Sequence, residues 1–195
     1  MISISPLTNV LKEGLFGDYK DKKESNLIKI QEEKNLLITQ IVQYKNSSLQ
    51  IRDVVIDGLS MSHDPLNVIS NNDTRILWNG PKNWLLISKK KNLNENIKKT
   101  FVESDFAVTD LSHSRAIIGL EGENLKEILK KGCPYNFNEI KKNMCVNSVF
   151  NGITITIDMI EENPEKIRLL ALRSFGESLA ESITDACLEY GYKSI

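Results

Sequence analysis

RILWNGPKNWLLI, at residues 75–87, contains two apolar runs separated by residues 79–83. Asn, Gly and Pro dominate this connection, and turns favour them because they tolerate or preset the backbone angles that a turn needs. Two short apolar runs joined by so brief a connection predict an antiparallel hairpin. The stretch therefore indicates a protein that is built on antiparallel strands.

Toward the N-terminus, residues 27–45 have a strand-like pattern, with Leu, Ile and Val concentrated at 36–42. A second strand-like segment, residues 49–56, follows a turn cluster, so we expect the two to pair antiparallel. Residues 59–74 are rich in Ser, Asn and Asp and are typical of a loop. Residues 1–24 are mixed and Lys-rich, which indicates an irregular arm.

Toward the C-terminus, the spacing of apolar residues predicts helices over 92–102, 123–131 and 175–190. Strand-like segments are predicted at residues 106–111, 115–120, 146–150, 153–160 and 166–172. Asn151-Gly152 predicts a tight hairpin between two of these strands. Sheet hairpins interrupted by helices favour an α+β fold over a parallel doubly wound one.

Three local signals mark where the last two helices begin and end. Gly132 is expected to form a left-handed C-terminal cap, and Gly191 is expected to end the last helix. Ser174 and Glu177 have the spacing of a capping box at the start of the last helix.

Composition excludes several classes of protein. The 195 residues include 25 Lys and Arg against 26 Asp and Glu, so the basic excess typical of nucleic acid-binding domains is missing. Neither a signal peptide nor an apolar run of about 18 residues is present. We expect a cytoplasmic protein with no nucleic acid and no membrane as partner. Cys133, Cys145 and Cys187 are odd in number and lack metal spacing, which indicates buried free thiols.

The sequence contains few candidates for chemistry. His63 stands in a loop without a second ligand at metal spacing, and a metal site there is disfavoured. His113 lies in the polar segment 110–115, which favours a turn or a subunit contact over catalysis. Trp78 and Trp84 could stack a ligand, but their strand context favours the core. No phosphate-binding glycine motif is present. We therefore expect no catalytic, cofactor-binding or metal-binding residue in this chain.

The hairpin at 75–86 contains the pattern Leu-Trp-x-Gly-Pro-x-x-Trp-Leu, and the largely polar segment 108–115 is followed by the segment 119–129. In this order, these segments resemble the hairpin and the central segment of the gamma subunit of heterotetrameric sarcosine oxidase. Gly132-Cys133-Pro134 and Arg173-Ser174-Phe175 are similar to two further family signatures. Asp110-Leu111-Ser112-His113 also resembles a stretch of glycine-cleavage T-proteins, which implies a related folate-binding-domain-like fold. Lys82-Asn83 departs from the family, where acidic residues often precede the Trp.

The resemblance implies an accessory subunit without chemistry of its own, and a domain of the gamma type over 26–195 after an arm at 1–25. The complex it implies has alpha, beta, gamma and delta subunits and demethylates sarcosine to glycine, with tetrahydrofolate as the one-carbon acceptor. FAD, FMN, NAD, tetrahydrofolate and zinc are then expected on the other subunits. The alternatives are the equivalent subunit of N-methylglutamate dehydrogenase and a free-standing folate-binding aminomethyltransferase-like protein.

Four residues are candidates for contact with other subunits: Arg115, His113, Arg173 and Phe175. Arg115 and Arg173 are two of only five arginines, and both lie in family-like segments. A guanidinium fork suits an interfacial carboxylate, although an internal ion pair or a helix-end contact would also explain either residue.

Overall fold

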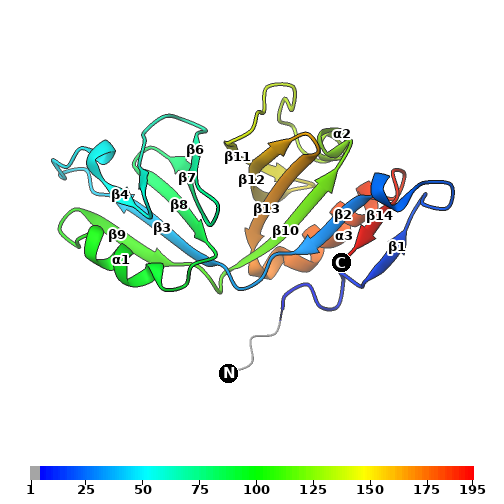
Figure 1. Cartoon of the computed structure of the whole chain (residues 1–195), viewed down its shortest axis with the longest axis horizontal. Helices are drawn as coiled ribbons and strands as arrows, with labels where there is room; N and C mark the ends of the chain where they lie inside the picture. Colours follow the sequence, from blue (N-terminus) through cyan, green and yellow to red (C-terminus); the bar gives the residue numbers. More distant parts are fainter. Residues whose placement is uncertain (1–4) are drawn as a thin grey trace. The chain divides into compact units, whose positions relative to one another are not determined.

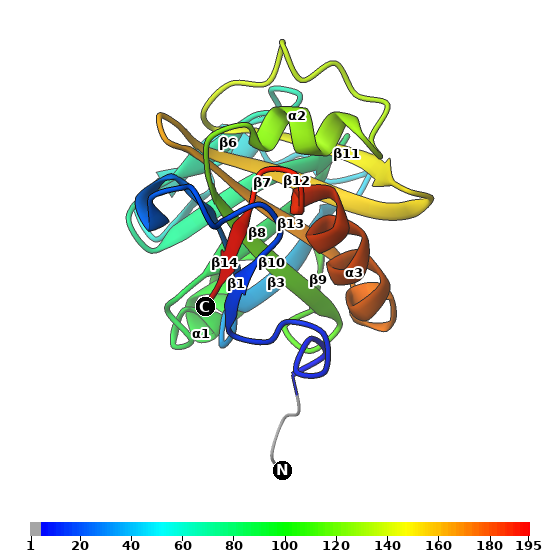
Figure 2. The same cartoon turned by 90° about the vertical axis from the view of Figure 1, so that its right-hand side faces the viewer.

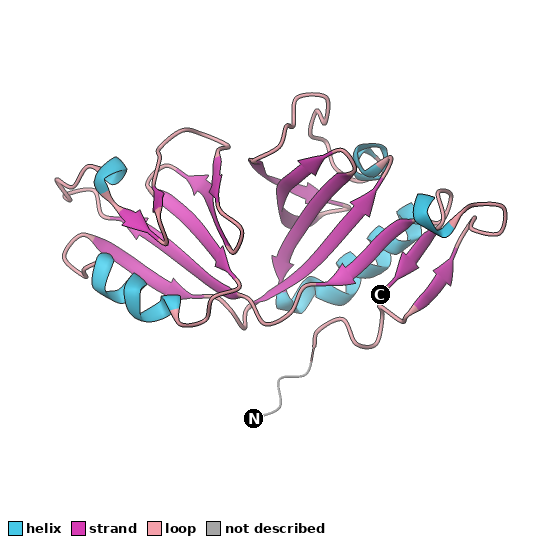
Figure 3. Cartoon of the chain, in the orientation of Figure 1, coloured by secondary structure: helices cyan, strands magenta, loops and turns pink. Residues whose placement is uncertain are grey.

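The computed structural model describes residues 5–195, which form two compact units (Figure 1). The first unit comprises residues 5–34, 114–142 and 147–195, and the second comprises 35–113 and 143–146. Each unit is built around its own β-sheet. Strands account for more of residues 5–195 than helices do (Figure 3). The predicted α+β class is confirmed.

The second unit contains an antiparallel five-stranded sheet with the strand order β6-β7-β8-β3-β9. These strands are β3 (Leu37–Gln43), β6 (Val68–Ser70), β7 (Thr74–Gly80), β8 (Asn83–Ser88) and β9 (Phe106–Asp110). The predicted hairpin is confirmed as β7–β8, in which Trp78 lies opposite Trp84. Its connection is shorter than expected, because only Pro81 and Lys82 lie outside the two strands.

The predicted pairing of residues 36–42 with 49–56 is wrong. Strand β3 pairs with β8 and β9 instead. The segment 49–56 contains a 3₁₀ turn (Ile51–Asp53) and the two-residue strand β4 (Val55–Ile56), which pairs with β5 (Leu59–Ser60). The turn buries Ile51 and leaves too few extended residues in this segment to pair along β3. Strands β5 and β6 also lie within the segment predicted as a loop.

One face of this sheet carries the core of the second unit. Helix α1 (Leu93–Thr100) contributes Leu93 and Ile97, which are buried together with Ile41 and Trp84 of the sheet. The indole Nε1 of Trp84 donates to the Ser62 carbonyl at 2.7 Å, so the polar atom of this buried ring has a partner. The core interpretation is confirmed for Trp84, whereas Trp78 is half-buried.

The first unit is built on a seven-stranded sheet with the order β1-β14-β2-β10-β13-β12-β11, of which only the first residues of β11, 144–146, are grouped with the second unit. Its strands are β1 (Gly14–Phe16), β2 (Ile28–Glu32), β10 (Arg115–Gly122), β11 (Met144–Phe150), β12 (Ile153–Glu162), β13 (Glu165–Leu172) and β14 (Tyr192–Ser194). Strand β14 pairs with β2 in parallel, and β2–β10, β10–β13 and β13–β12 are antiparallel. Strand β1 lies within the segment that we expected to be irregular, and a 3₁₀ turn (Glu24–Asn26) precedes β2.

Two helices belong to the first unit, α2 (Leu125–Lys130) and α3 (Gly176–Cys187), and both lie beside its sheet (Figure 2). Helix α3 buries Leu179, Ala180 and Ile183. It follows a 3₁₀ turn (Arg173–Phe175) that begins where β13 ends. The predictions of both helices and of the hairpin at Asn151-Gly152 are confirmed.

Two of the predicted caps are wrong. Gly132 does not adopt a left-handed conformation. A Cβ atom there would lie 2.6 Å from Asn151 Oδ1 and 2.9 Å from Phe150 Cε2, so the side chains of these two residues approach Gly132 closely. Ser174 lies within the 3₁₀ turn and makes no capping hydrogen bond, because α3 begins only at Gly176. Gly191 has a left-handed φ of 68°, as predicted for the chain reversal after the last helix.

Across residues 5–195, none of the helices combines the length and apolar character that a membrane crossing requires.

Candidate subunit interface

Three of the four predicted interface residues lie together at one end of the first unit's sheet. Arg115 is the first residue of β10 and lies opposite Leu172, the last residue of β13. The 3₁₀ turn that follows Leu172 contains Arg173 and Phe175. The pairing of β10 with β13 therefore brings together residues that are nearly 60 positions apart in the sequence.

Arg115 and Arg173 both bond to Ser114. The backbone N–H of Arg173 donates to the Ser114 carbonyl at 2.9 Å. The guanidinium Nη1 of Arg115 donates to the same carbonyl at 3.3 Å and to the Ser114 hydroxyl at 3.4 Å. These two side-chain bonds are long, and they occupy one nitrogen of a group that carries five N–H donors.

Exposed apolar side chains accompany the two arginines. Leu172 is 47% exposed and Phe175 is 48% exposed, and both are large enough to contribute substantially to a protein interface. We call Arg115, Leu172, Arg173 and Phe175 the Arg115 surface. The sequence analysis did not identify Leu172. Strand alternation does not distinguish it, because β13 is buried on both faces from Ile167 to Ala171 and the exposure of Leu172 arises only at the strand's end.

The electrostatic environment of Arg115 differs from that of Arg168, which is buried in the same sheet. Arg168 Nη2 lies 2.6 Å from Glu33 Oε2, and its Nη1 lies 3.4 Å from Asp158 Oδ2. Arg115 is half-buried, and desolvation lowers its pKa. Within residues 5–195, no carboxylate lies within ion-pair distance of Arg115. Its charge is therefore partly removed from water without a compensating anion.

His113, the fourth predicted interface residue, lies in the second unit and is exposed. It belongs to a polar turn in which the Ser112 N–H donates to Asp110 Oδ1 at 2.8 Å. The Ser112 hydroxyl accepts the Ile38 N–H at 3.0 Å. Hydrogen bonds from the Ser112 hydroxyl and N–H lower the pKa of Asp110. The polar groups of this segment therefore hold a turn, and the Ser112 oxygen is engaged by the backbone.

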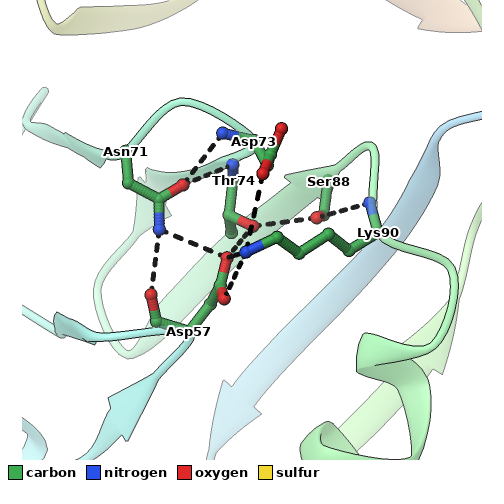
Figure 4. Close-up of polar contacts among 6 residues, drawn as sticks. All are labelled: Asp57, Asn71, Asp73, Thr74, Ser88 and Lys90. Carbon is green, nitrogen blue, oxygen red and sulfur yellow. Dashed lines mark hydrogen bonds and ion pairs between the residues drawn. The ribbon is translucent and has the colours of Figure 1, made fainter.

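A second polar cluster lies in the second unit, around Asp57 (Figure 4). The Asp57 carboxylate accepts hydrogen bonds from Lys90, Thr74 and Asn71. Thr74 Oγ1 also lies 2.8 Å from Ser88 Oγ. The Asp57 hydrogen bond raises the pKa of Lys90, so its amine stays protonated and cannot serve as a base. This cluster joins three segments of the unit and offers no reactive group.

The remaining candidate residues are not assembled into a reactive group. Cys133, Cys145 and Cys187 are all buried as free thiols. His63 is exposed, and its ring lies 5.3 Å from that of Trp84. In the part of the chain from residue 5 onward, no three His, Cys, Asp or Glu side chains gather as a metal site would require.

Comparison with known proteins identifies the family. Residues 54–189, which include the whole Arg115 surface, match the sarcosine oxidase gamma subunit family. The chain belongs to this family. A relative with the name sarcosine oxidase subunit gamma, from Corynebacterium sp. strain U-96, is 27% identical over 120 residues. That alignment covers 60% of this chain and 58% of the relative.

Solved structures show that this member of the gamma family shares its fold with two proteins. A chain of heterotetrameric sarcosine oxidase from Corynebacterium sp. U-96 superposes with a TM-score of 0.81 at 19% identity, over 96% of this chain and 95% of that chain. Aminomethyltransferase T of the glycine cleavage system from Bartonella henselae superposes with a TM-score of 0.61 at 9% identity. That match covers 82% of this chain and 46% of the transferase chain. The expected T-protein-like fold is confirmed.

Proposed function

We propose that this chain is the accessory gamma subunit of a heterotetrameric sarcosine oxidase complex. The observation that carries the proposal is the family match over residues 54–189. The complex would demethylate sarcosine oxidatively to glycine and transfer the one-carbon unit to tetrahydrofolate. This places the chain in sarcosine catabolism and one-carbon metabolism.

The role of the chain in this proposal is assembly. Its partners would be the alpha, beta and delta subunits, which would carry FAD, FMN, NAD, tetrahydrofolate and zinc. The Arg115 surface supports an assembly role, because exposed apolar side chains beside a partly desolvated cation are suited to a protein partner. Arg115, Arg173 and Phe175 would contact another subunit there, and His113 would make a further contact.

Purification from the native host tests this proposal. A tag on this chain should co-purify larger flavin-bearing chains in fixed stoichiometry, which native mass spectrometry and the flavin absorbance spectrum would detect. The purified complex should oxidise sarcosine. Preferential oxidation of N-methylglutamate would assign the chain to the related dehydrogenase. A colourless monomer that binds tetrahydrofolate unaided would replace the proposal with a free-standing folate-binding protein.

A further inference from the structure

We propose that Arg115 is the receptor for a carboxylate side chain of a neighbouring subunit, and that Leu172 and Phe175 pack around that contact. The inference rests on the proposed function, because it needs a partner chain. It goes further by naming the chemical group that the partner supplies and the residue that binds it.

The first observation is the unused bonding capacity of the Arg115 side chain. A guanidinium presents five N–H donors in a planar fork, and a carboxylate fills two of them at once. Within residues 5–195, Arg115 makes the two long bonds from Nη1 to Ser114 and no other side-chain hydrogen bond. The Nε and Nη2 donors therefore remain available for a bidentate acceptor.

The second observation is that the positive charge of Arg115 is partly removed from water. Partial burial lowers the pKa of Arg115, and among the described residues 5–195 no charged group contributes to the change. A desolvated cation without an anion is unfavourable, and an incoming carboxylate would restore the lost interaction. Arg168 shows the arrangement that this chain uses for a buried arginine, with Glu33 and Asp158 as carboxylate partners.

The third observation is the apolar surround. Leu172 lies opposite Arg115 in the sheet, and Phe175 follows within the next three residues. Covering these exposed side chains would exclude water from the ion pair, and charge-assisted hydrogen bonds strengthen when water is excluded. A protein surface can cover both side chains and present an acidic residue at the same time. We therefore assign the carboxylate to a partner subunit rather than to a small molecule.

Dissociation of the assembled complex tests the inference. Arg115→Gln should weaken binding of this subunit by at least about 30-fold, because the partner carboxylate would be left buried without its cation. Native mass spectrometry of the complex over a dilution series would measure the dissociation constant. Arg52→Gln is the matched control, because it also removes one arginine charge but at an exposed site, and it should leave the constant unchanged.

Arg115→Lys provides the second variant. It keeps the charge but loses the fork, so we expect a weakening on the order of several-fold. In that variant complex, a carbodiimide should couple the new amine to the partner carboxylate as an amide, while the reagent takes up the elements of water and leaves as a urea. Tandem mass spectrometry would then identify the acidic residue. Circular dichroism would verify that both variants are folded.

The outcomes separate the inference from the proposed function. If the wild-type chain joins no flavin-bearing complex, the proposed function fails and the inference fails with it. If the wild-type complex forms and the dissociation constants of both Arg115 variants equal that of wild type, the inference is overturned while the proposed function stands. If Arg115→Gln does not fold, the dissociation constant of Arg115→Lys decides in the same way.

Discussion

Asp57 and Lys90 form an ion pair that joins two segments of the second unit that are distant in the sequence. Lys90 Nζ lies 2.8 Å from Asp57 Oδ1 and 3.1 Å from Oδ2 (Figure 4). Asp57 lies in the turn between β4 and β5, and Lys90 follows the end of β8. Thr74, at the start of β7, donates to the same carboxylate at 2.6 Å. One carboxylate thus holds a hairpin turn against the end of the sheet.

Replacing this carboxylate should destabilise the second unit. We expect Asp57→Asn to lower the free energy of unfolding by about 1–2 kcal/mol at pH 7, since the site is partly open to solvent and charged hydrogen bonds there are screened. Urea unfolding followed by circular dichroism would measure the change. Asp53→Asn, at an exposed position, should change the free energy little, and an equal loss in both variants would contradict the role of the cluster.

The same pair predicts a pH dependence. Hydrogen bonds from Lys90 and then from Thr74 lower the pKa of Asp57 in the folded chain, relative to about 3.9 in the unfolded chain. The stability from this pair is therefore complete above the unfolded pKa, and it is lost as pH falls through the folded pKa. The difference in unfolding free energy between wild type and Asp57→Asn should shrink below about pH 4. A difference that grows on acidification would contradict this assignment.

A substitution at Thr39 should stabilise the folded chain. Its side chain is 1% exposed, and among residues 5–195 its Oγ1 atom has no hydrogen-bond partner. Thr39→Val keeps the shape and removes the unpaired hydroxyl, so we expect a gain of about 1–2 kcal/mol in the free energy of unfolding.

Thr74→Val is the matched control for that experiment. The Thr74 hydroxyl is also buried, but it bonds to Asp57 and Ser88. Its loss should destabilise the chain by about 1–3 kcal/mol. Thermal unfolding would show shifts of opposite sign, and a loss of stability in Thr39→Val would mean that the hydroxyl is satisfied in solution.

Substitution by alanine should lower the free energy of unfolding by different amounts at two glycines with left-handed backbone conformations. Gly152 has a φ of 84° and open space where a Cβ would lie, so Gly152→Ala should cost only the conformational penalty of about 1–2 kcal/mol. Gly191 has a φ of 68°, and a Cβ there would lie 2.4 Å from the Asp18 carbonyl oxygen. Gly191→Ala should therefore cost more than Gly152→Ala in urea unfolding. Equal losses would contradict the close approach of the Asp18 backbone.

The buried thiols should resist modification in the folded chain. Burial raises the pKa of Cys187 to about 12, and thiolate is the reactive form. Iodoacetamide at pH 8 should leave Cys133, Cys145 and Cys187 unmodified in the native protein and alkylate all three in urea. Intact mass spectrometry would count the adducts, and rapid alkylation of the native chain would show that one of these thiols is accessible.

Local patterns in the sequence predicted those elements whose signal lies within a few residues. The β7–β8 hairpin, the turn at Asn151-Gly152 and the helices α1, α2 and α3 all have turn residues or apolar spacing of this kind. The family resemblance was also visible, because ordered motifs along the chain carry it. That residues 26–195 act as one domain stays a prediction.

Pairing between distant segments could not be predicted from such patterns. Strand β3 was expected to pair with its neighbour in sequence, but β8 and β9 pair with it instead. Strands β1 and β14 have three residues each, too few to show a period, and they are defined by pairing with each other and, for β14, with β2.

The sequence by itself determined the α+β class, the family and the choice of Arg115, Arg173 and Phe175 as interface candidates, because residue types and local spacing carry these signals. Only the tertiary structure decided that Leu172 joins them and that Arg168 has carboxylate partners while Arg115 has none within residues 5–195. These properties depend on which strand lies beside which, and strand register is set by the packing of the whole sheet rather than by any one segment.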